Sequence, residues 1–358
     1  MALRTSLLKF YKGKSVLVTG HTGFKGAWLA TWLKMMGSRV CGVALPPHGR
    51  PNLFTAAALA EQMESHFCDI RDLDAFSRLL QKHQPDIVIH NAAQALVLRS
   101  YQDPVDTYST NVMGTVNILQ AARQVRSVRS VVVITSDKCY ENREWIWGYR
   151  ENEALGGRDP YSSSKACAEL VTAAFRSSFF TESSAVSVAS ARAGNVVGGG
   201  DWAENRLIPD LIRGISHGSK ITIRNPQACR PWQHVLEPLQ GYLLLAERLF
   251  EEGTKFASAW NFGPNENLVP VKTIASRIIE LWGAKGVKIA APHHKLHEAQ
   301  HLVLDSSKAQ AELGWRPLLS LDETLRWTVE WYRGWERHTK NANALTHDQI
   351  QRYMDRLC

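Results

Sequence analysis

The chain has 358 residues and a formal net charge of +8, with 44% hydrophobic, 9% aromatic and 21% charged residues. This composition is that of an ordinary globular protein, so it excludes a disordered chain, a collagen and a coiled coil. The length predicts about two domains, and the excess of basic residues favours an anionic ligand.

The cysteines and the N-terminus indicate the compartment. The six cysteines are widely separated and form no CxxC pair, which is typical of proteins from a reducing compartment. Lys9, Lys12 and Lys14 interrupt the apolar N-terminal segment, so it does not match a signal peptide. No apolar stretch is long enough to span a bilayer. We therefore expect a cytoplasmic protein with no membrane partner.

The first half of the sequence alternates short apolar strands with helices. We expect strands at 15–19, 39–45, 67–70, 87–90, 131–135 and 185–191, and helices at 24–36, 73–82, 105–125 and 162–175. This alternation predicts an α/β fold of the Rossmann type, a doubly wound parallel sheet with helices on both faces.

The character of the sequence changes after Arg192. Three consecutive glycines at 198–200 must form a loop, and prolines interrupt the shorter elements that follow. We expect a Rossmann domain at 1–192, joined by later segments at about 232–262. A smaller mixed α/β domain at 193–345 and a C-terminal tail at 346–358 complete the prediction. The smaller domain should border the carboxyl end of the sheet, where open α/β sheets bind ligands.

A glycine-rich turn follows the first predicted strand and precedes a helix. The spacing of its glycines is GxxGxxG, which lets backbone amides approach a pyrophosphate at the helix N-terminus. The alternative is a plain strand-to-helix turn. The candidate dinucleotide-binding residues in this turn are Gly20, Thr22, Gly23, Phe24, Lys25 and Gly26.

The adenine end of a dinucleotide is less well defined. The second strand runs into Leu45-Pro46-Pro47 without the acidic residue that would hold the ribose, so the residues leave NAD and NADP open. Asp69 and Ile70, after the third strand, are candidate contacts of the adenine. A helix-capping role for Asp69 is the alternative.

A second motif places acid–base groups at the same edge of the sheet. Tyr161 and Lys165 are four residues apart on a predicted helix, so they share one face. A nearby ammonium lowers the pKa of a phenol and makes it a usable base. The strand at 131–135 delivers Ser136, Asp137 and Lys138 to its carboxyl end. These five residues are the candidate catalytic group, and a solvated turn is the alternative for the triplet.

These motifs resemble the extended short-chain dehydrogenase/reductase family. The resemblance rests on the turn TGHTGFKG, the segment HNAAQ at 90–94, Asn111 and YSSSK. More narrowly, the segments 135–140, 142–151, 192–195, 198–202 and 230–237 are similar to CDP-D-glucose 4,6-dehydratases. The resemblance implies NAD as the cofactor. It adds to the cofactor site, besides Tyr161 and Lys165, the residues Ala92, Ala93, Gln94 and Asn111.

The resemblance also implies a reaction. CDP-D-glucose would become CDP-4-keto-6-deoxy-D-glucose by hydride transfer from C4 to C6 through NAD, as a precursor of deoxyhexoses for surface polysaccharide. Tyr161 would take the O4 proton, Ser136 would bond O4, and Lys165 would hold the ribose. Asp137 would protonate the leaving hydroxyl. Relatives that act on dTDP-glucose have glutamate where this chain has Lys138, so the base that removes the C5 proton is left open.

Substrate residues and partners follow from the same resemblance. The substrate-side residues are Asn195, Arg206, Leu207 and Arg230, since arginine suits a diphosphate. A surface ion pair is the alternative for either arginine. The family implies a homo-oligomer, a dimer or a dimer of dimers. The competing functions are another nucleotide-sugar 4,6-dehydratase, a 4-epimerase, and a non-catalytic NAD(P)-binding regulator, although both YxxxK residues are present.

Other patterns in the sequence are set aside. His297 and His301 complete an HExxH zinc motif, but Pro292 precedes it and a strand-like run follows, so no long helix and no metal are expected. The arginines at 123, 126 and 129 lack interleaved aromatics, so no nucleic-acid partner is expected. The tryptophans at 327, 331 and 335 form a helical stripe, which predicts packing against the core or another subunit.

Overall fold

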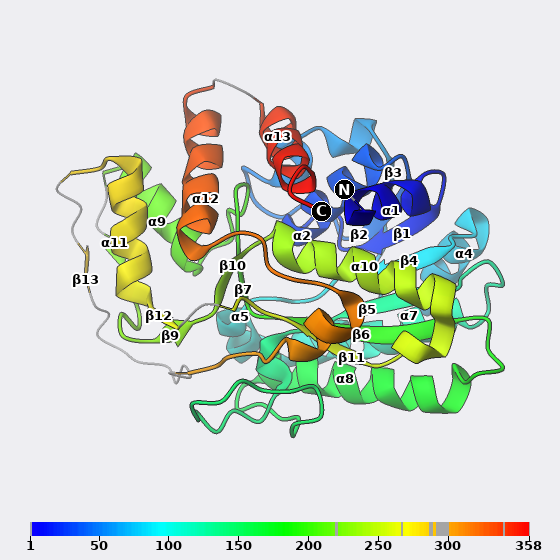
Figure 1. The fold of residues 1–358 in the computed structure, drawn as a ribbon. Helices are drawn as coiled ribbons and strands as arrows, with labels where there is room; N and C mark the ends of the chain where they lie inside the picture. Colours follow the sequence, from blue (N-terminus) through cyan, green and yellow to red (C-terminus); the bar gives the residue numbers. More distant parts are fainter. Residues whose placement is uncertain are drawn as a thin grey trace.

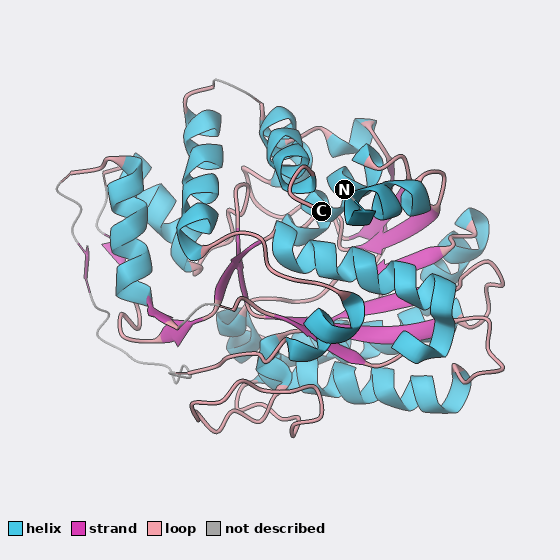
Figure 2. Cartoon of the chain, in the orientation of Figure 1, coloured by secondary structure: helices cyan, strands magenta, loops and turns pink. Residues whose placement is uncertain are grey.

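A computed structural model describes residues 2–218, 221–265, 268–285, 289–290, 301–338 and 341–357. Its centre is a seven-stranded sheet in the order β11-β6-β5-β4-β1-β2-β3, with every neighbouring pair parallel (Figures 1 and 2). The strands are β1 (Ser15–Thr19), β2 (Arg39–Ala44), β3 (Glu64–Phe67), β4 (Ile87–His90), β5 (Ser130–Ile134), β6 (Ser187–Ala193) and β11 (Ala259–Phe262). The first six follow the Rossmann order, which confirms the predicted fold class.

Alternate residues of the central strands enter two separate cores. Val16 and Val18 of β1 face one core, and Leu17 between them faces the other. The first core is covered by α2 (Phe24–Met35) and α10 (Leu236–Glu252). The second is covered by α4 (Leu73–His83), α7 (Gly114–Ala122) and α8 (Pro160–Phe179). Because both faces of the sheet are buried, its central strands are continuous apolar runs.

Helices α4 and α8 each begin at an aspartate that caps the helix. Asp72 accepts a hydrogen bond from the Ala75 amide at the start of α4, and Asp159 accepts one from the Ser162 amide at the start of α8. The helix expected at 105–125 is divided into α6 (Pro104–Tyr108), a π-helical turn (Ser109–Met113) and α7. The remaining helices of this half are α1 (Ala2–Tyr11), α3 (Leu53–Ala56) and α5 (Val97–Gln102).

The strand predicted at 67–70 is wrong. The edge strand β3 lies earlier, at Glu64–Phe67, and pairs only with β2. Its residues Glu-Ser-His-Phe are mostly polar and partly exposed, because an edge strand has a neighbour on one side only. The apolar pattern that marks the central strands is therefore missing here.

The segments after β6 form a second, smaller region, on the left in Figure 1. It holds three two-stranded pairs, β7–β10, β9–β12 and β8–β13. Its elements are β7 (Asn195–Val197), α9 (Leu207–Ser216), β8 (Ile221–Thr222), β9 (Cys229–Arg230), β10 (Trp232–His234), β12 (Val269–Pro270), α11 (Val271–Trp282) and β13 (Ile289–Ala290). Among the described residues, no helix has the length and the apolar character needed to cross a membrane.

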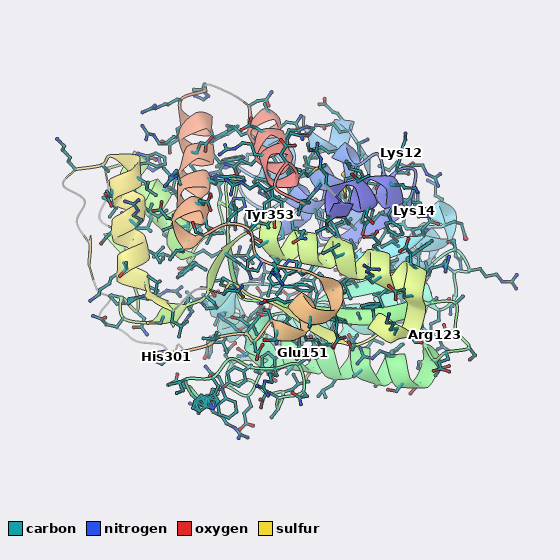
Figure 3. All side chains as sticks on the ribbon, viewed as in Figure 1. Lys12, Lys14, Arg123, Glu151, His301 and Tyr353 are labelled. Carbon is teal, nitrogen blue, oxygen red and sulfur yellow. The ribbon has the colours of Figure 1, made fainter. Side chains whose placement is uncertain are left out.

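The C-terminal segment is not a tail. Residues 342–354 form helix α13 (Ala342–Met354), which follows α12 (Leu321–Glu336) and packs on α2. The rings of Trp32 and Tyr353 lie 5.6 Å apart, and the Tyr353 hydroxyl donates to Glu237 at 2.8 Å (Tyr353 is labelled in Figure 3). The tail predicted at 346–358 is therefore wrong for residues 346–354, which belong to this helix. The remainder of the two-domain division stays a prediction.

The tryptophan stripe of α12 packs inward, as one of its two interpretations predicted. Trp327 and Trp331 are buried. The ring of Trp202, from the loop after the three glycines, lies 5.6 Å from Trp331 and 5.7 Å from Trp335. A Cβ at Gly199 would lie 2.0 Å from the Trp331 side chain. The stripe therefore fixes the loop 198–202, which borders the site described next.

Candidate active site

A cavity of about 390 Å³ lies between the carboxyl end of the sheet and the smaller region. Four of the five predicted catalytic residues line it, namely Ser136, Asp137, Lys138 and Tyr161. All four predicted substrate residues line it as well, namely Asn195, Arg206, Leu207 and Arg230. The structure therefore brings together two groups of residues that are far apart in the sequence.

The triplet after β5 presents a carboxyl group to this cavity. Ser136 Oγ donates to Asp137 Oδ1 at 2.9 Å and accepts from the Lys138 amide at 3.2 Å. Within the described chain, Asp137 Oδ2 is buried and has no hydrogen-bond partner. Burial raises the pKa of Asp137, while the charges of Lys138 and Arg230 oppose the shift. A carboxyl in this environment can hold a proton and release it to a ligand.

Tyr161 lies in the first turn of α8. Asp159 caps that helix and Pro160 occupies its first position, so the start of the helix is well defined. Tyr161 is buried, and burial raises its pKa to about 12, against the hydrogen bond with Ser136 and the charge of Arg206, which lower it. The Lys138 ammonium lies 5.8 Å from the centre of the Tyr161 ring.

Lys165 stands one turn further along α8, behind the cavity wall. Its ammonium donates to the Ile134 carbonyl at 3.2 Å. Burial lowers its pKa to about 8, and the Glu169 carboxylate acts in the opposite direction. The expected lowering of the Tyr161 pKa is not seen in this structure, because the cost of burying a phenolate is larger than the effect of the surrounding cations.

A buried ion pair behind the cavity was missed by the sequence analysis. Glu169 of α8 and Arg192 of β6 lie 2.8 Å apart, and each side chain is only 3% exposed. Glu169 also accepts hydrogen bonds from Thr135 and from Ser190. Arg192 donates to the Tyr140 hydroxyl at 2.7 Å and to the carbonyl of Glu151 (labelled in Figure 3) at 3.0 Å. The pair thereby holds Thr135, just before the catalytic triplet, and Tyr140, shortly after it.

No local motif could have revealed this pair, because its two members stand on different elements, α8 and β6. The sequence analysis noted Arg192 and the segment 142–151 only as parts of a resemblance. It also assigned no role to several polar residues of the cavity wall, among them Asn142, Arg158, Asp201 and Arg224.

The glycine-rich turn has the shape that a pyrophosphate needs. Gly20 has a φ of +76°, and a Cβ there would lie 2.8 Å from Ala92 Cα. A Cβ at Gly26 would lie 2.1 Å from the Gly20 carbonyl oxygen. Only glycine fits at these two positions. Gly23 begins α2 with no side-chain cap, so the first amides of that helix remain available to an anion. The turn therefore fits a dinucleotide.

Phe24 and Lys25, in the first turn of α2, reach the cavity wall. The Lys25 ammonium lies 3.4 Å from the Tyr242 hydroxyl. Burial, together with the like charges of Lys165 and Arg206, lowers the pKa of Lys25 to about 7. The cavity thus meets the glycine-rich turn at a lysine whose proton a nearby anion would hold more tightly.

The other predicted cofactor side chains are bonded within the protein. Thr22 Oγ1 donates to the Leu45 carbonyl at 3.0 Å. Asn111 accepts from the Gln94 amide at 2.8 Å and donates to the Gln94 carbonyl at 3.0 Å and to Ser164 Oγ at 2.8 Å. Asn111 therefore ties the segment that holds Ala92 and Ala93 to helix α8. These side chains shape the backbone of the site.

Asp69 and Ile70 lie apart from the cavity. The Arg71 guanidinium donates to Asp69 at 2.6 Å and the Arg71 amide does so at 2.9 Å, which lowers the pKa of Asp69. The capping alternative for Asp69 is wrong, because Asp72 caps α4. Ile70 is buried, and a Cβ at Gly114 would lie 2.5 Å from it. Their contact with an adenine stays a prediction.

The two predicted substrate-side arginines, Arg206 and Arg230, both line the cavity. Arg206 pairs with Asp201 at 2.9 Å and remains about one-third exposed. Arg230, on the two-residue strand β9, donates to the Cys229 carbonyl at 2.9 Å. Asn195 begins β7, and Leu207 begins α9. Lys25 and Lys138 line the same cavity, so several basic side chains are available to a diphosphate.

Most of the HExxH motif lies outside the described residues, which exclude 291–300. Its last residue, His301, is exposed (labelled in Figure 3), and its carbonyl accepts a hydrogen bond from Asn142 at 3.0 Å.

Comparison with known proteins gives consistent matches over nearly the whole chain. Residues 17–328 match the family model described as GDP-mannose 4,6 dehydratase. A CDP-glucose 4,6-dehydratase of Salmonella typhimurium is 53% identical over 333 residues, which are 92% of this chain and 93% of the relative. A dTDP-glucose 4,6-dehydratase of Xanthomonas campestris is 28% identical over 336 residues, 88% of this chain and 92% of the relative.

Solved structures share the fold. A dTDP-glucose 4,6-dehydratase from Streptomyces venezuelae with NAD bound has a TM-score of 0.77 at 25% identity, over 90% of this chain and 98% of the other. A UDP-glucose 4-epimerase from Thermotoga maritima with UDP-glucose has a TM-score of 0.78 at 24% identity, over 91% and 99%. Since both enzymes share this architecture, the fold alone does not separate dehydration from epimerisation.

Proposed function

The chain belongs to the GDP-mannose 4,6-dehydratase family, within the extended short-chain dehydrogenases/reductases, and we propose that it is a hydro-lyase that converts CDP-D-glucose to CDP-4-keto-6-deoxy-D-glucose and water. The observation that carries the proposal is the 53% identity, over 92% of the chain, with a CDP-glucose 4,6-dehydratase. The cavity lined by Ser136, Asp137 and Tyr161 supports the same reaction.

NAD is the cofactor of this reaction. The backbone of Gly20, Gly23 and Gly26 would hold its pyrophosphate, and Lys165 would bond its ribose. When bound, NAD supplies reversible hydride transfer with the sugar. Asn111 supports the site from below by holding Gln94 and Ser164 in place.

We assign the first proton transfer to Tyr161. Its phenol takes the proton from O4 as C4 is oxidised, and Ser136 bonds the same oxygen. Because burial raises the pKa of Tyr161 to about 12 even though Ser136 and Arg206 oppose it, its phenolate must be stabilised further by nearby cations when the substrate is bound. Lys138, 5.8 Å from the ring, and Arg206 are placed to do so.

Water loss then requires an acid and a base. The 4-ketone acidifies the C5 proton, and the C6–O bond breaks as that proton is removed. Asp137, whose pKa is raised by burial, holds the proton that converts the leaving hydroxyl to water. Lys138 lies beside it. An ammonium must lose its proton to act as the C5 base; charged, it would instead stabilise the enolate.

The opposite wall binds the nucleotide diphosphate. Arg206 and Arg230 present guanidinium groups that bond two phosphate oxygens at once. Asn195 and Leu207 line the same cavity and contact the substrate beside the sugar.

The proposal is tested by incubating the purified chain and NAD separately with CDP-, dTDP-, UDP- and GDP-glucose, followed by mass spectrometry. Loss of one water from CDP-glucose alone is the expected result. Water loss from a different nucleotide would keep the reaction and change the substrate. A C4 epimer of unchanged mass would make the chain a 4-epimerase, and no turnover with NAD or NADP would favour a regulator.

We also propose a homo-oligomer, a dimer or a dimer of dimers, in the cytoplasm. Large apolar side chains are exposed on the adjacent elements α5, α6, the π-helical turn and α8, namely Tyr101, Val105, Met113 and Leu170. Five cysteines are free thiols, as in a reducing compartment. Sedimentation of Leu170→Glu should show a smaller species than the unmodified chain; an unchanged species would remove this face from the interface.

A further inference from the structure

Four metal-ligating side chains meet at the β3 edge of the sheet, away from the cavity. Cys41 lies on β2, Glu64 and His66 lie on β3, and His83 is the last residue of α4. One ligand atom from each residue lies within 4.8 Å of all the others. None of the four lines the cavity. The sequence analysis predicted no metal site and overlooked this group.

The fold explains why these residues meet. Cys41 pairs with Glu64, and Val43 pairs with His66, so these side chains share one face of the sheet. Helix α4 covers that face, since Phe76 and Leu80 belong to the same core as Cys41 and Val43. The last turn of the helix therefore places His83 over the edge strand.

The group has unused bonding capacity. His83 Nδ1 lies 3.0 Å from Glu64 Oε2, and His66 Nε2 lies 3.9 Å from the same oxygen. In the described part of the chain, Nε2 of His66 and Nε2 of His83 are both buried without a hydrogen-bond partner. The His83 side chain is only 9% exposed. Buried imidazole nitrogens are costly to leave unbonded, and a cation shared by the cluster would bond them.

We propose that Cys41, Glu64, His66 and His83 form a Zn²⁺ site. A thiolate, two imidazoles and a carboxylate are the donors that Zn²⁺ takes in tetrahedral sites, with bonds of about 2.0–2.3 Å. Such bonds place the ligand atoms ~3.5 Å apart, so the present spread of up to 4.8 Å must contract by about one ångström. Glu64, whose side chain is 66% exposed, has the freedom to move.

The site is structural. Four protein ligands fill a tetrahedral shell and leave no open position for a substrate. The metal would join the edge strand β3, which pairs only with β2, to the end of α4. Without a cation, burial raises the pKa of the Cys41 thiol to about 12; a bound Zn²⁺ would deprotonate it. Stability should therefore depend on zinc, and turnover should not.

The test uses the full chain stripped with a chelator and titrated with Zn²⁺ alone. We expect one zinc retained per chain after desalting and a higher melting temperature with zinc. Co²⁺ in place of Zn²⁺ should give the charge-transfer absorption of a cobalt–thiolate bond. His83→Gln and Cys41→Ser should weaken Zn²⁺ binding by about 100-fold or more, since even outer-shell changes cost about 10- to 100-fold.

Matched controls separate this site from chance binding. Cys68→Ser and the exposed His338→Gln change the same residue types outside the cluster, and both should bind zinc as the unmodified chain does. Because Cys41 is buried, circular dichroism without zinc checks that Cys41→Ser folds like the unmodified chain. His83→Gln changes a residue at the end of a helix and tests the proposal independently. The proposal is overturned if the unmodified chain retains no zinc, or if His83→Gln binds it equally well.

Discussion

The two walls of the cavity are built differently. On the sheet side, Ser136, Asp137 and Tyr161 are buried and stand at the end of β5 and the start of α8. The Glu169–Arg192 pair joins α8 to β6, the neighbour of β5. On the other side, Arg206 and Arg230 stand at a helix start and on a two-residue strand.

This difference matches what each wall has to do. Proton transfer needs groups held in a fixed geometry with shifted pKa values, which requires burial and a supporting network. Binding a diphosphate needs charge and several donors, and it tolerates movement of long side chains. Changes on the sheet wall should therefore reduce the rate of chemistry, whereas changes on the other wall should reduce affinity.

The largest effect is expected for Tyr161→Phe. Removing the hydroxyl removes the group that accepts the O4 proton, so kcat should fall by about 1,000-fold or more, while affinity for CDP-glucose stays the same. Steady-state kinetics and equilibrium binding measure the two quantities. Tyr101→Phe, at a side chain that is 44% exposed, is the matched control. A fall in affinity without a fall in kcat would contradict the division between the walls.

Lys138→Ala should affect the loss of water more than the oxidation at C4. We expect water loss to slow by about 100-fold, while oxidation at C4 slows less, because Tyr161, Ser136 and Arg206 remain. Mass spectrometry of quenched single turnovers distinguishes the loss of two hydrogens from the loss of water. Lys34→Ala, on the exposed side of α2, is the control. Elimination at an unchanged rate would remove Lys138 from the mechanism.

Arg230→Ala tests the opposite wall. Loss of a charged hydrogen-bond donor costs about 1.5–3 kcal/mol, so KM should rise by about 10- to 100-fold with little change in kcat. The control is Arg248→Ala on α10, which removes an arginine that pairs with Glu252 outside the cavity. If KM is unchanged, Arg230 does not bind the diphosphate.

The smallest expected effect is on stability, at the contact between helix α10 and the C-terminal segment. Glu237, at the start of α10, accepts bonds from the Leu318 and Leu319 amides and the Tyr353 hydroxyl. Burial raises its pKa to about 7. Since the folded chain binds this proton more tightly than the unfolded chain, the contribution to stability is complete below about pH 4 and is lost as the pH rises to about 7.

Glu237→Gln should remove this pH dependence, because glutamine keeps one acceptor oxygen and carries no charge. The free energy of unfolding, measured in urea at pH 5 and pH 8, should differ less between the two pH values in the variant, by about 1–2 kcal/mol. Glu252→Gln, at an exposed pair on the same helix, should leave the difference as it is. An equal pH dependence in Glu237→Gln and the unmodified chain would show that Glu237 titrates normally.

The sequence predicted the central strands well and the edge strand poorly. The strands at 15–19 and 87–90 have the predicted bounds, because burial on both faces leaves a continuous apolar run. The edge strand β3 is polar, and its predicted position was displaced by three residues at each end. The C-terminal helix α13 was expected to be a tail because its partner, α2, is more than 300 residues away in the sequence.

For the site, local spacing in the sequence was enough to find the catalytic side chains but not to predict their pKa values. A strand end and an i, i+4 pair pointed to Ser136, Asp137, Tyr161 and Lys165, because neighbours in sequence stay neighbours in a turn or a helix. Their pKa values depend on burial, which the whole fold decides. The expected low pKa of Tyr161 is accordingly replaced by a raised one.

The sequence by itself thus determined the alternation of the sheet, the glycine-rich turn and the catalytic motif, since each strand, turn and helical pair is encoded by residues that are close together in the sequence. Only the tertiary structure decided which distant side chains meet. The Glu169–Arg192 pair, the tie of Asn111 to Gln94 and Ser164, and the cluster around His83 all join separate elements. Their partners are chosen by strand order and helix packing, which no local pattern records.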